Sequence, residues 1–295
     1  MDLGRVGIWT GTLDAVPSAV ACERAAELEA LGFRTLWIPE TIGRDPFVTA
    51  TQLLSATSTL QIATGIANIY ARDAVTMANT QRSLEEAYPG RFLLGLGVSH
   101  HHLVDRVRKH DYSKPYSYMV QYLADMDAAR FLAVGPTSLP PRVLAALGPK
   151  MLALSASAAA GAHPYFVPVE HTAEARSVLG PEAMLLPEQM VVLDTDPTSA
   201  RATARGGMAV YLRAPNYVNN LERLGFTDDD VADGGSDKLV DAIVAWGDES
   251  TVLARVQQHL DAGATHVCVQ VLQPDLTAVP AEAWKSLAAA LSDAK

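Results

Sequence analysis

The feature that most constrains the fold is a repeated alternation of short apolar runs with longer amphipathic stretches. RVGIW at 5–9, FRTLWI at 33–38 and LQIATGI at 60–66 are each followed by a stretch with helical spacing. Strand-like runs that alternate with helices predict βαβ units and a parallel sheet. RFLLGLGV at 91–98 is apolar throughout, which is typical of a parallel strand buried on both faces. The chain is therefore predicted to be an α/β protein.

The alternation continues along the rest of the chain. Further strands are expected at 142–148, 162–167, 188–194 and 265–272, which brings the total to eight, each followed by a helical pattern. Eight units on 295 residues fit a (β/α)8 TIM barrel, a fold that typically takes about 250 residues. No linker or composition shift divides the chain, so we predict one domain over 1–295. Residues 197–247 are expected to be an insertion of helix and loop near the C-terminal third.

An open, doubly wound sheet is the competing architecture. Its usual mark is a GxGxxG turn directly after the first strand, where backbone N–H groups bind a phosphate. Here the first strand runs into GIWTGT at 7–12, which lacks that spacing. The barrel is therefore the predicted fold.

Composition narrows the range of partners. A net charge of -10 argues against nucleic-acid binding, which needs an excess of Lys and Arg. The two cysteines, Cys22 and Cys268, are too few for a disulfide framework. The opening MDLGRVGIW lacks the basic and apolar regions of a signal peptide, and no apolar run reaches the roughly 18 residues of a membrane span. We therefore expect a cytoplasmic protein that acts on a small molecule, with no membrane partner.

The predicted fold indicates where chemistry should lie. In a (β/α)8 barrel the active site forms at the C-terminal ends of the strands. Trp9 and Tyr70 are expected there as pocket walls, although an aromatic residue at a strand end is more often a packing residue. The residues just after the expected strands are Trp9, Thr10, Pro39, Glu40, Thr41, Ala67, Asn68, Tyr70, Ser99, His100, Leu147, Gly148, Ala162 and His163.

Five segments spread over the whole chain resemble the luciferase-like flavin and coenzyme F420-dependent oxidoreductases. They are LGFRTLWIPE, GRDPF, ATGIANIYARD, EEAYPGRFLLGLGVSH and LDAGATHVCVQ. GRDPF, TGIANIYARD and GLGVSH are similar to an actinobacterial F420-dependent subgroup in particular. The resemblance implies a luciferase-like (β/α)8 barrel that transfers a hydride between the deazaflavin F420 and a small organic substrate. It also implies a homodimer, formed through helices near the second and third strands, such as the apolar helix at 46–58.

The resemblance further implies a cofactor site. Relatives have a non-prolyl cis peptide at the end of the third strand, which backs the deazaflavin ring, and the matching bond is Gly65–Ile66. By itself, a glycine within a strand is more often an ordinary bulge. The backbone after the fifth and sixth strands faces the phosphate-bearing side, where Gly148-Pro149 could open a helix that binds an anion. The cofactor-binding residues implied are Glu40, Gly65, Ile66, Asn68, Gly97, Val98, Ser99, His100, Leu147, Gly148, Gly161, Ala162 and His163.

Two residues are predicted to handle protons. Relatives place an acidic residue and then a histidine after the second strand, but this chain has Glu40 and Thr41. Glu40 could act itself if burial raises its pKa, or it could only bond the cofactor or cap a helix. Relatives often carry a glutamate after the fourth strand, where this chain has His100. A histidine, with an ordinary pKa near 6.5, can donate or accept a proton at neutral pH.

Other polar residues near these ends are open to more than one interpretation. His100, His101 and His102 are consecutive and point different ways, so we predict no metal site and treat the last two as solvated loop residues. Arg72 and Arg142 are candidate cations for a phosphate, although surface ion pairs explain them equally well.

Three functional hypotheses follow. The first is an F420-dependent oxidoreductase with His100 and Glu40 as proton partners. The second keeps the fold but uses FMN, which would make the protein an oxygen-activating monooxygenase. The third is a non-catalytic cofactor-binding paralogue, for which the missing histidine after the second strand is the main support. Residues 197–247 are expected to shape the substrate pocket.

Overall fold

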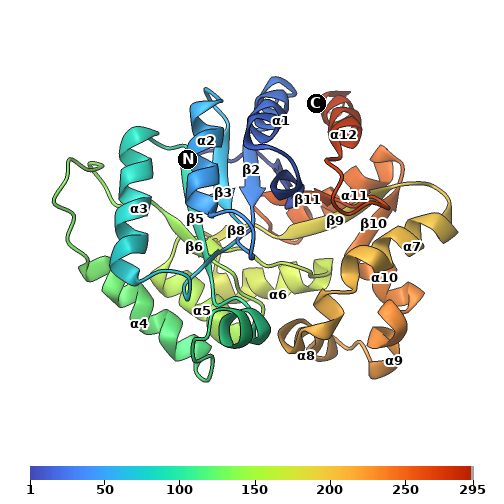
Figure 1. Cartoon of the computed structure of the whole chain (residues 1–295). Coiled ribbons are helices and arrows are strands. Elements are labelled where there is room, and N and C mark those ends of the chain that lie inside the picture. The colour runs from blue at the N-terminus through green and yellow to red at the C-terminus, as the bar shows by residue number, and fades with distance from the viewer. Residues whose placement is uncertain (294–295) are drawn as a thin grey trace.

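The computed structural model describes residues 1–293, and it has a parallel sheet surrounded by helices (Figure 1). From β1 to β8, neighbouring strands of the sheet follow the chain order and run parallel, and β4 lies off this path, paired with β5. The strands are β1 (Val6–Trp9), β2 (Thr35–Ile38), β3 (Gln61–Thr64), β4 (Ala67–Asn68), β5 (Phe92–Gly97), β6 (Arg142–Leu144), β7 (Gly161–Ala162), β8 (Met184–Leu185), β9 (Glu188–Leu193), β10 (Val244–Gly247) and β11 (Val267–Val271).

The sheet closes on itself because β8 and β9 are two halves of one extended run. β8 pairs with β7, and the Leu186 and Glu188 N–H groups continue that contact by donating to the carbonyls of Ala162 and Pro164. β9 pairs on its other side with β11, and β11 pairs with β1. The predicted (β/α)8 barrel is therefore confirmed, with β8 and β9 together as its seventh strand.

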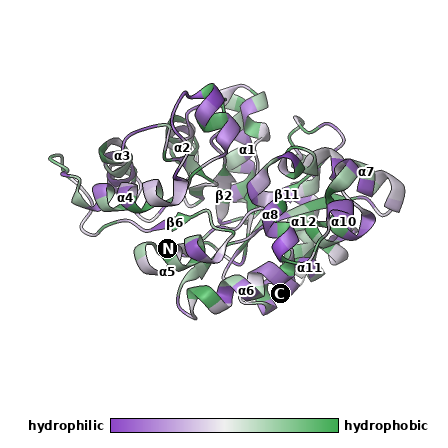
Figure 2. Ribbon diagram, turned by 90° about the horizontal axis from the view of Figure 1, so that it is seen from below, coloured by the Kyte–Doolittle hydropathy of each residue, from purple (hydrophilic) through white to green (hydrophobic). Residues whose placement is uncertain are grey.

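The helices fall close to where the amphipathic spacing placed them. They alternate hydrophilic and hydrophobic stretches along the ribbon, as expected for helices that cover a barrel (Figure 2). The helices of the regular units are α1 (Ser18–Ala30), α2 (Pro46–Ser55), α3 (Ala74–Ala87), α4 (Pro115–Ala128), α5 (Pro149–Ala158), α6 (Val169–Leu179), α11 (Glu249–Asp261) and α12 (Ala281–Asp293).

Caps fix several of these helix starts. Asp45 accepts from the Phe47 and Val48 N–H groups at the start of α2, and Asp73 accepts from the Thr76 N–H at the start of α3. A carboxylate at this position satisfies N–H groups that lack partners within the helix. The loops that precede these helices carry the candidate site residues, so the caps also fix the loop ends.

The hydrophobic core has two layers, one on each side of the sheet. Outside the sheet, Ile8, Leu36 and Ile62 are fully buried and belong to the cluster that also contains the inner faces of α1 and α2. Inside the barrel, Trp37 and Leu93 are fully buried. A strand that buries both faces reads as a continuous apolar run, which is why 91–98 was informative.

The insertion predicted at 197–247 is mostly helical and gathers on one side of the barrel (Figure 1). The strand β10 was not predicted, because VAWG follows the last helix of the insertion with no turn residue between them. β10 lies parallel beside β9, with Val244 opposite Met190 and Gly247 opposite Leu193. The helices of the insertion are α7 (Pro197–Met208), the 3₁₀ helix η3 (Tyr211–Arg213), α8 (Pro215–Arg223), α9 (Asp228–Val231), the 3₁₀ helix η4 (Ala232–Gly234) and α10 (Asp237–Ile243).

Two strands are shorter than predicted. The run expected at 162–167 pairs only as Gly161–Ala162, and the one expected at 142–148 only as Arg142–Leu144. In the run at 162–167, Pro164 lacks the N–H that a regular ladder needs, so the strand ends early. The segments that follow both strands are thereby free to line the pocket.

Two predictions concern membranes and other copies of the chain. Over residues 1–293, none of the helices combines the length and apolar character that crossing a bilayer would require. Val48 on α2 and Val75 on α3 are 59% and 48% exposed, so a homodimer through this face stays a prediction.

Candidate functional site

A pocket of about 260 Å³ lies at the C-terminal end of the barrel, where the sequence placed the chemistry. It is lined by the last residues of β1 and β5, by residues that follow β2, β3, β5, β6 and β7, and by residues of the insertion. Ten predicted site or wall residues are among the lining: Trp9, Glu40, Gly65, Ile66, Gly97, Val98, Ser99, His100, Leu147 and His163.

Five other predicted residues lie outside this lining. Asn68 is buried in β4, and Gly148 is the N-cap of α5. Gly161 and Ala162 form β7 within the sheet, so a direct ligand contact stays a prediction for all four. Tyr70 is not a pocket wall: it stacks on Tyr118 with ring centroids 4.6 Å apart.

The Gly65–Ile66 peptide bond is cis, as the resemblance implied. Gly65 lies in a gap that no side chain could share, because an added Cβ would be 2.5 Å from Trp9 Nε1 and 3.0 Å from His163 Nε2. Trp9 Nε1 also donates to the Gly65 carbonyl at 3.2 Å. Gly97 leaves room for the Ile66 side chain, with which an added Cβ would overlap. The glycines at 65 and 97 are therefore required by close packing at the pocket floor.

The carboxylate of Glu40 is fully engaged. Arg72 donates to it twice, at 2.8 and 2.9 Å, and Arg108 once at 3.4 Å. The Asn68 N–H donates to Oε2 at 2.7 Å, and only 5% of the Glu40 side chain is exposed. With both oxygens occupied by protein donors, Glu40 orders the loops around the pocket, a role that the sequence did not predict. Proton transfer by Glu40 and its contact with a cofactor stay predictions.

The two candidate phosphate cations are also paired within the protein. Arg72 bridges Glu40 and Asp45, and its guanidinium lies 4.7 Å from the centre of the Phe47 ring. Arg142 pairs with Asp127 at 2.7 and 3.0 Å. Both arginines therefore have a structural explanation, and a role in binding phosphate stays a prediction.

His100 is held by a residue of the insertion. Its Nδ1 lies 3.2 Å from Asn216 Oδ1, and its ring centroid is 5.5 Å from that of Tyr217. An amide oxygen only accepts hydrogen bonds, so Nδ1 carries the proton and Nε2 is the free acceptor. Burial lowers the pKa of His100 below its ordinary value, against an opposing contribution from the Asn216 hydrogen bond. His100 is therefore a neutral imidazole with one lone pair available at neutral pH.

His163 contributes a second lone pair to the pocket. Its Nδ1 donates to the Leu186 carbonyl at 2.6 Å, and its ring stacks on Trp37 with centroids 4.4 Å apart. Burial lowers its pKa to about 4, so the ring is neutral. Nε2, buried and turned toward Gly65, has no partner in the protein. A buried acceptor of this kind is expected to bond a donor on a ligand.

Three lining residues that the sequence did not single out come from the insertion. Tyr211 lies in η3, and Asn216 and Tyr217 lie in α8. A fourth, Tyr165, follows β7. The segment YLRAPNY at 211–217 combines aromatic and amide side chains within a predicted insertion, and it was the only local signal. Spacing alone could not say that this segment turns back over the strand ends.

A buried acid lies in the barrel near these tyrosines. Glu188 is 1% exposed and stands opposite Cys268 in the register of β9 and β11. The Phe166 N–H donates to Oε2 at 3.2 Å, while Oε1 has no partner. Burial raises the pKa of Glu188 to about 8, so the carboxyl group is protonated at neutral pH.

The remaining histidines of the loop do not form a metal site with their neighbours. His101 and His102 are exposed on the surface, and His102 opens a short π-helix, His102–Val107. Over residues 1–293, no three His, Cys, Asp or Glu side chains are placed to hold a metal ion together.

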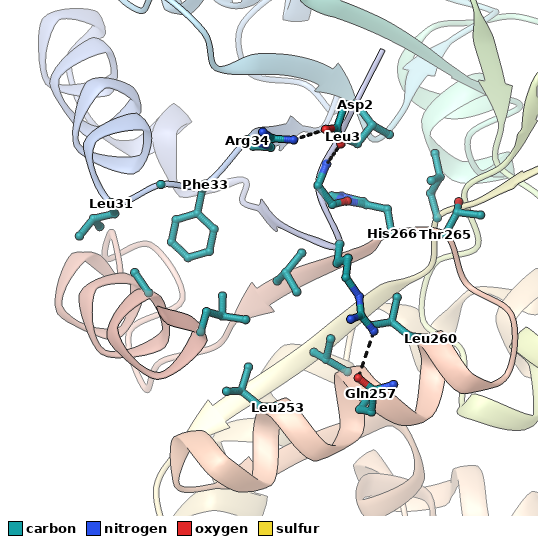
Figure 3. Close-up of a pocket in the computed structure, with 18 of the residues that line it drawn as sticks. Asp2, Leu3, Leu31, Phe33, Arg34, Leu253, Gln257, Leu260, Thr265 and His266 are labelled. Carbon is teal, nitrogen blue, oxygen red and sulfur yellow. Dashed lines mark hydrogen bonds and ion pairs between the residues drawn. The ribbon is translucent and has the colours of Figure 1, made fainter. Parts of the chain in front are cut away.

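A larger cavity, of about 870 Å³, lies at the opposite end of the barrel beside α11 and α12 (Figure 3). Its polar groups mostly pair with each other: Arg34 with Asp2, and Arg5 with Gln257. His266 in its wall donates to the Gly4 carbonyl at 2.7 Å and accepts from Trp37 Nε1. None of the candidate site residues at the C-terminal strand ends lines this cavity. Active sites of (β/α)8 barrels lie at that C-terminal face, opposite the cavity.

Three comparisons place this geometry among known proteins. The model of the luciferase-like monooxygenase family matches residues 3–266. The 5,10-methylenetetrahydromethanopterin reductase of Methanolobus tindarius is 26% identical over 288 residues, which cover 81% of this chain and 86% of that protein.

Solved structures share the fold at lower identity. An F420-dependent secondary alcohol dehydrogenase, solved with an F420-acetone adduct, is 14% identical with a TM-score of 0.80 and covers 99% of both chains. The oxygenating constituent of 3,6-diketocamphane monooxygenase from Pseudomonas putida, solved with FMN, is 14% identical with a TM-score of 0.66 and covers 96% of this chain and 95% of its own.

Proposed function

Because the chain belongs to the luciferase-like monooxygenase family, we propose that it is an oxidoreductase that binds coenzyme F420 and acts on a small organic substrate. The observation that carries the proposal is the convergence, in one pocket, of the Gly65–Ile66 floor, the partnerless Nε2 of His163 and the neutral imidazole of His100. Relatives and neighbours whose names include F420 support this choice of cofactor.

The residues present fit a flat heteroaromatic ring. Glycines 65 and 97 keep the floor free of side chains, and His163 Nε2 offers an acceptor to a ring N–H. Leu147 and Met151 both line the pocket, so α5 begins at its edge, and a helix N-terminus favours an anionic tail. When bound, the deazaflavin would supply the site that donates or accepts a hydride.

The chain's own residues would handle the substrate proton. His100 Nε2 is an acceptor, held in place by Asn216, and a neutral imidazole can take the hydroxyl proton of an alcohol as that alcohol is oxidised. In the reverse direction the imidazolium returns the proton to a carbonyl oxygen. Glu40 would hold the loop geometry through Arg72 and Arg108 and take no part in proton transfer.

Titration of the protein with F420 and, separately, with FMN tests the cofactor. We expect saturable F420 binding in the micromolar range or tighter, followed by ligand fluorescence, and weak FMN binding. Gly97→Leu should abolish F420 binding because the added side chain collides with Ile66. Gly206→Ala, on α7 with open space around it, is the matched control and should bind as the parent does.

Two other outcomes of the titrations would favour the alternative functions. Preference for FMN, with oxygen consumed, would replace the proposal by a flavin monooxygenase, as the fold of the camphane enzyme allows. Tight F420 binding without hydride exchange toward any acceptor would favour a cofactor-binding paralogue that has lost catalysis.

A further inference from the structure

One wall of the pocket is aromatic and is assembled from distant parts of the chain. Trp9 is the last residue of β1, Tyr165 follows β7, and Tyr211 and Tyr217 come from the insertion. The ring centroids of Trp9 and Tyr165 are 5.1 Å apart, as are those of Tyr165 and Tyr211. Tyr217 lies 5.4 Å from Tyr211 in an edge-to-face arrangement. These four side chains, the aromatic wall, form a continuous set of packed rings.

The tyrosine hydroxyls of this wall are mainly directed to other protein groups. Tyr165 donates to Gln270 Oε1 at 2.7 Å, and its hydroxyl lies 2.6 Å from that of Tyr211. Burial raises the pKa of Tyr211 to about 12 and that of Tyr165 and Tyr217 well above the ordinary value. The wall therefore presents uncharged ring surface, which favours contact with another ring.

The pocket offers no free charge to a ligand among the described lining residues. Glu40 is its one acidic residue, and Arg72 and Arg108 already pair with that carboxylate. The histidines His100 and His163 are neutral because burial lowers the pKa of each. An ion buried here would lose its hydration without gaining a partner of opposite charge.

We infer that the substrate is an uncharged molecule that carries an aromatic ring beside its reacting alcohol or carbonyl group. This deepens the proposed F420-dependent function and rests on it. The ring packs on the aromatic wall, and the oxygen bonds to His100 Nε2. In the oxidative direction the carbinol C–H bond would break, and a bound deazaflavin would supply the acceptor for its electron pair and hydrogen as hydride. The hydroxyl proton passes to Nε2, and the C=O bond forms.

An organic cation is the alternative ligand for a set of aromatic rings, through cation–π attraction. A neutral ligand is favoured because the charge of Glu40 is already balanced by two arginines. The experiment below therefore includes a cationic probe.

Four ketones serve as probes on the F420-loaded protein: acetophenone, 2-butanone, 4-acetylbenzoate and 4-acetyl-N,N,N-trimethylanilinium. Binding is measured by calorimetry with oxidised F420, and turnover by the absorbance change on reoxidation of reduced F420. We expect acetophenone to bind about tenfold more tightly than 2-butanone, as one aromatic contact provides. We expect both charged ketones to bind at least about thirtyfold more weakly than acetophenone.

Variants test whether the wall is the cause. Tyr217→Leu should reduce the preference for acetophenone over 2-butanone to about twofold while F420 affinity stays as in the parent. Tyr211→Leu is a second variant with the same expectation, and thermal unfolding shows that each is folded. Tyr116→Leu, on α4 and 41% exposed, is the matched control and should keep the full preference.

Equal binding of acetophenone and 2-butanone, or tighter binding of either charged ketone, would overturn the inference while F420 binding upheld the proposed function. Failure to bind F420 at all would overturn the proposed function, and this inference with it.

Discussion

At the scale of single residues, the protonation form of His100 depends on Asn216, a residue 116 positions away in sequence. If Nε2 takes the substrate proton, His100→Ala should lower kcat by about 100- to 1000-fold, the usual value of a positioned base. F420 affinity should change by less than about twofold, because the imidazole contributes to proton transfer and not to ring binding. Steady-state kinetics and F420 titration of the variant measure the two effects, and an equal loss of both would rule out the proton role.

Asn216→Asp gives a complementary test at the same hydrogen bond. A carboxylate next to Nδ1–H stabilises the imidazolium, so the pKa of His100 should rise. In the parent, burial holds that pKa below 6.5, and kcat/KM should fall only at pH values below this. In the variant, the acid limb should move to higher pH. Asn219→Asp, an exposed change on the same helix, should leave the profile in place.

His100 and Glu40 could be selected from the sequence because each lies two residues after a predicted strand. The hydrogen-bond partners of these two side chains could not be predicted from the sequence. The partners that decide their roles, Asn216 for His100 and Arg108 for Glu40, lie in the insertion and in a loop whose paths are not determined by local spacing. The aromatic residues Tyr211 and Tyr217 were missed for the same reason.

At the scale of elements, β3 and β5 approach so closely that Gly95 has no room for a side chain. An added Cβ would overlap the Thr64 carbonyl oxygen, which is backbone and cannot turn aside. Gly95→Ala should therefore lower the free energy of unfolding by about 2–4 kcal/mol. Gly206→Ala, in the last turn of α7 with no atoms near the new methyl group, should raise it by about 0.5–1 kcal/mol. Urea unfolding measures both, and equal effects would contradict the close approach.

The elements were the best-predicted level of the structure. The strands β1, β2, β3 and β5 were each located within a few residues, because apolar runs between helical patterns have few other interpretations. The short strands were harder. β7 is only Gly161–Ala162 and is defined by its partners Leu144 and Met184–Leu185, which lie far away in sequence. β10 follows its helix without a turn, so the change in periodicity was not visible.

At the scale of the whole molecule, buried titratable groups set the pH of greatest stability. Burial lowers the pKa of His163 and His266 to about 4 and of His259 to about 3, so the folded protein keeps them neutral. Below pH 6.5 these histidines bind protons in the unfolded chain but stay neutral in the folded protein, so stability falls as the pH falls. Glu188 acts in the opposite direction. Between 4.5 and about 8 the folded state keeps a proton that the unfolded chain has lost, so stability falls as the pH rises.

These two effects meet near pH 6.5, where we expect the free energy of unfolding to be greatest. Near pH 5.5 the three histidines outweigh Glu188 by two protons, which gives a slope of about 2.7 kcal/mol per pH unit. Above this pH the slope reverses but is shallower, because the histidines of the unfolded chain still bind protons over part of the range in which Glu188 acts. Glu188→Gln should remove the alkaline limb and make the acid limb steeper by about 1.4 kcal/mol per pH unit, because one opposing proton is lost. Urea unfolding from pH 5 to 8 would contradict this account if the variant kept the alkaline decline.

The placement of β10 has a consequence for how this molecule can change. The chain leaves the barrel at Leu193, builds the helices that carry Tyr211, Asn216 and Tyr217, and returns as β10 beside the strand that it left. Because the segment begins and ends on neighbouring strands, its length adds little to the entropic cost of closing this loop in the barrel. The segment between them, 194–243, can therefore be exchanged as a unit. We expect a chimera with the equivalent segment of a homologue to take on that homologue's substrate preference while its affinity for the cofactor stays unchanged.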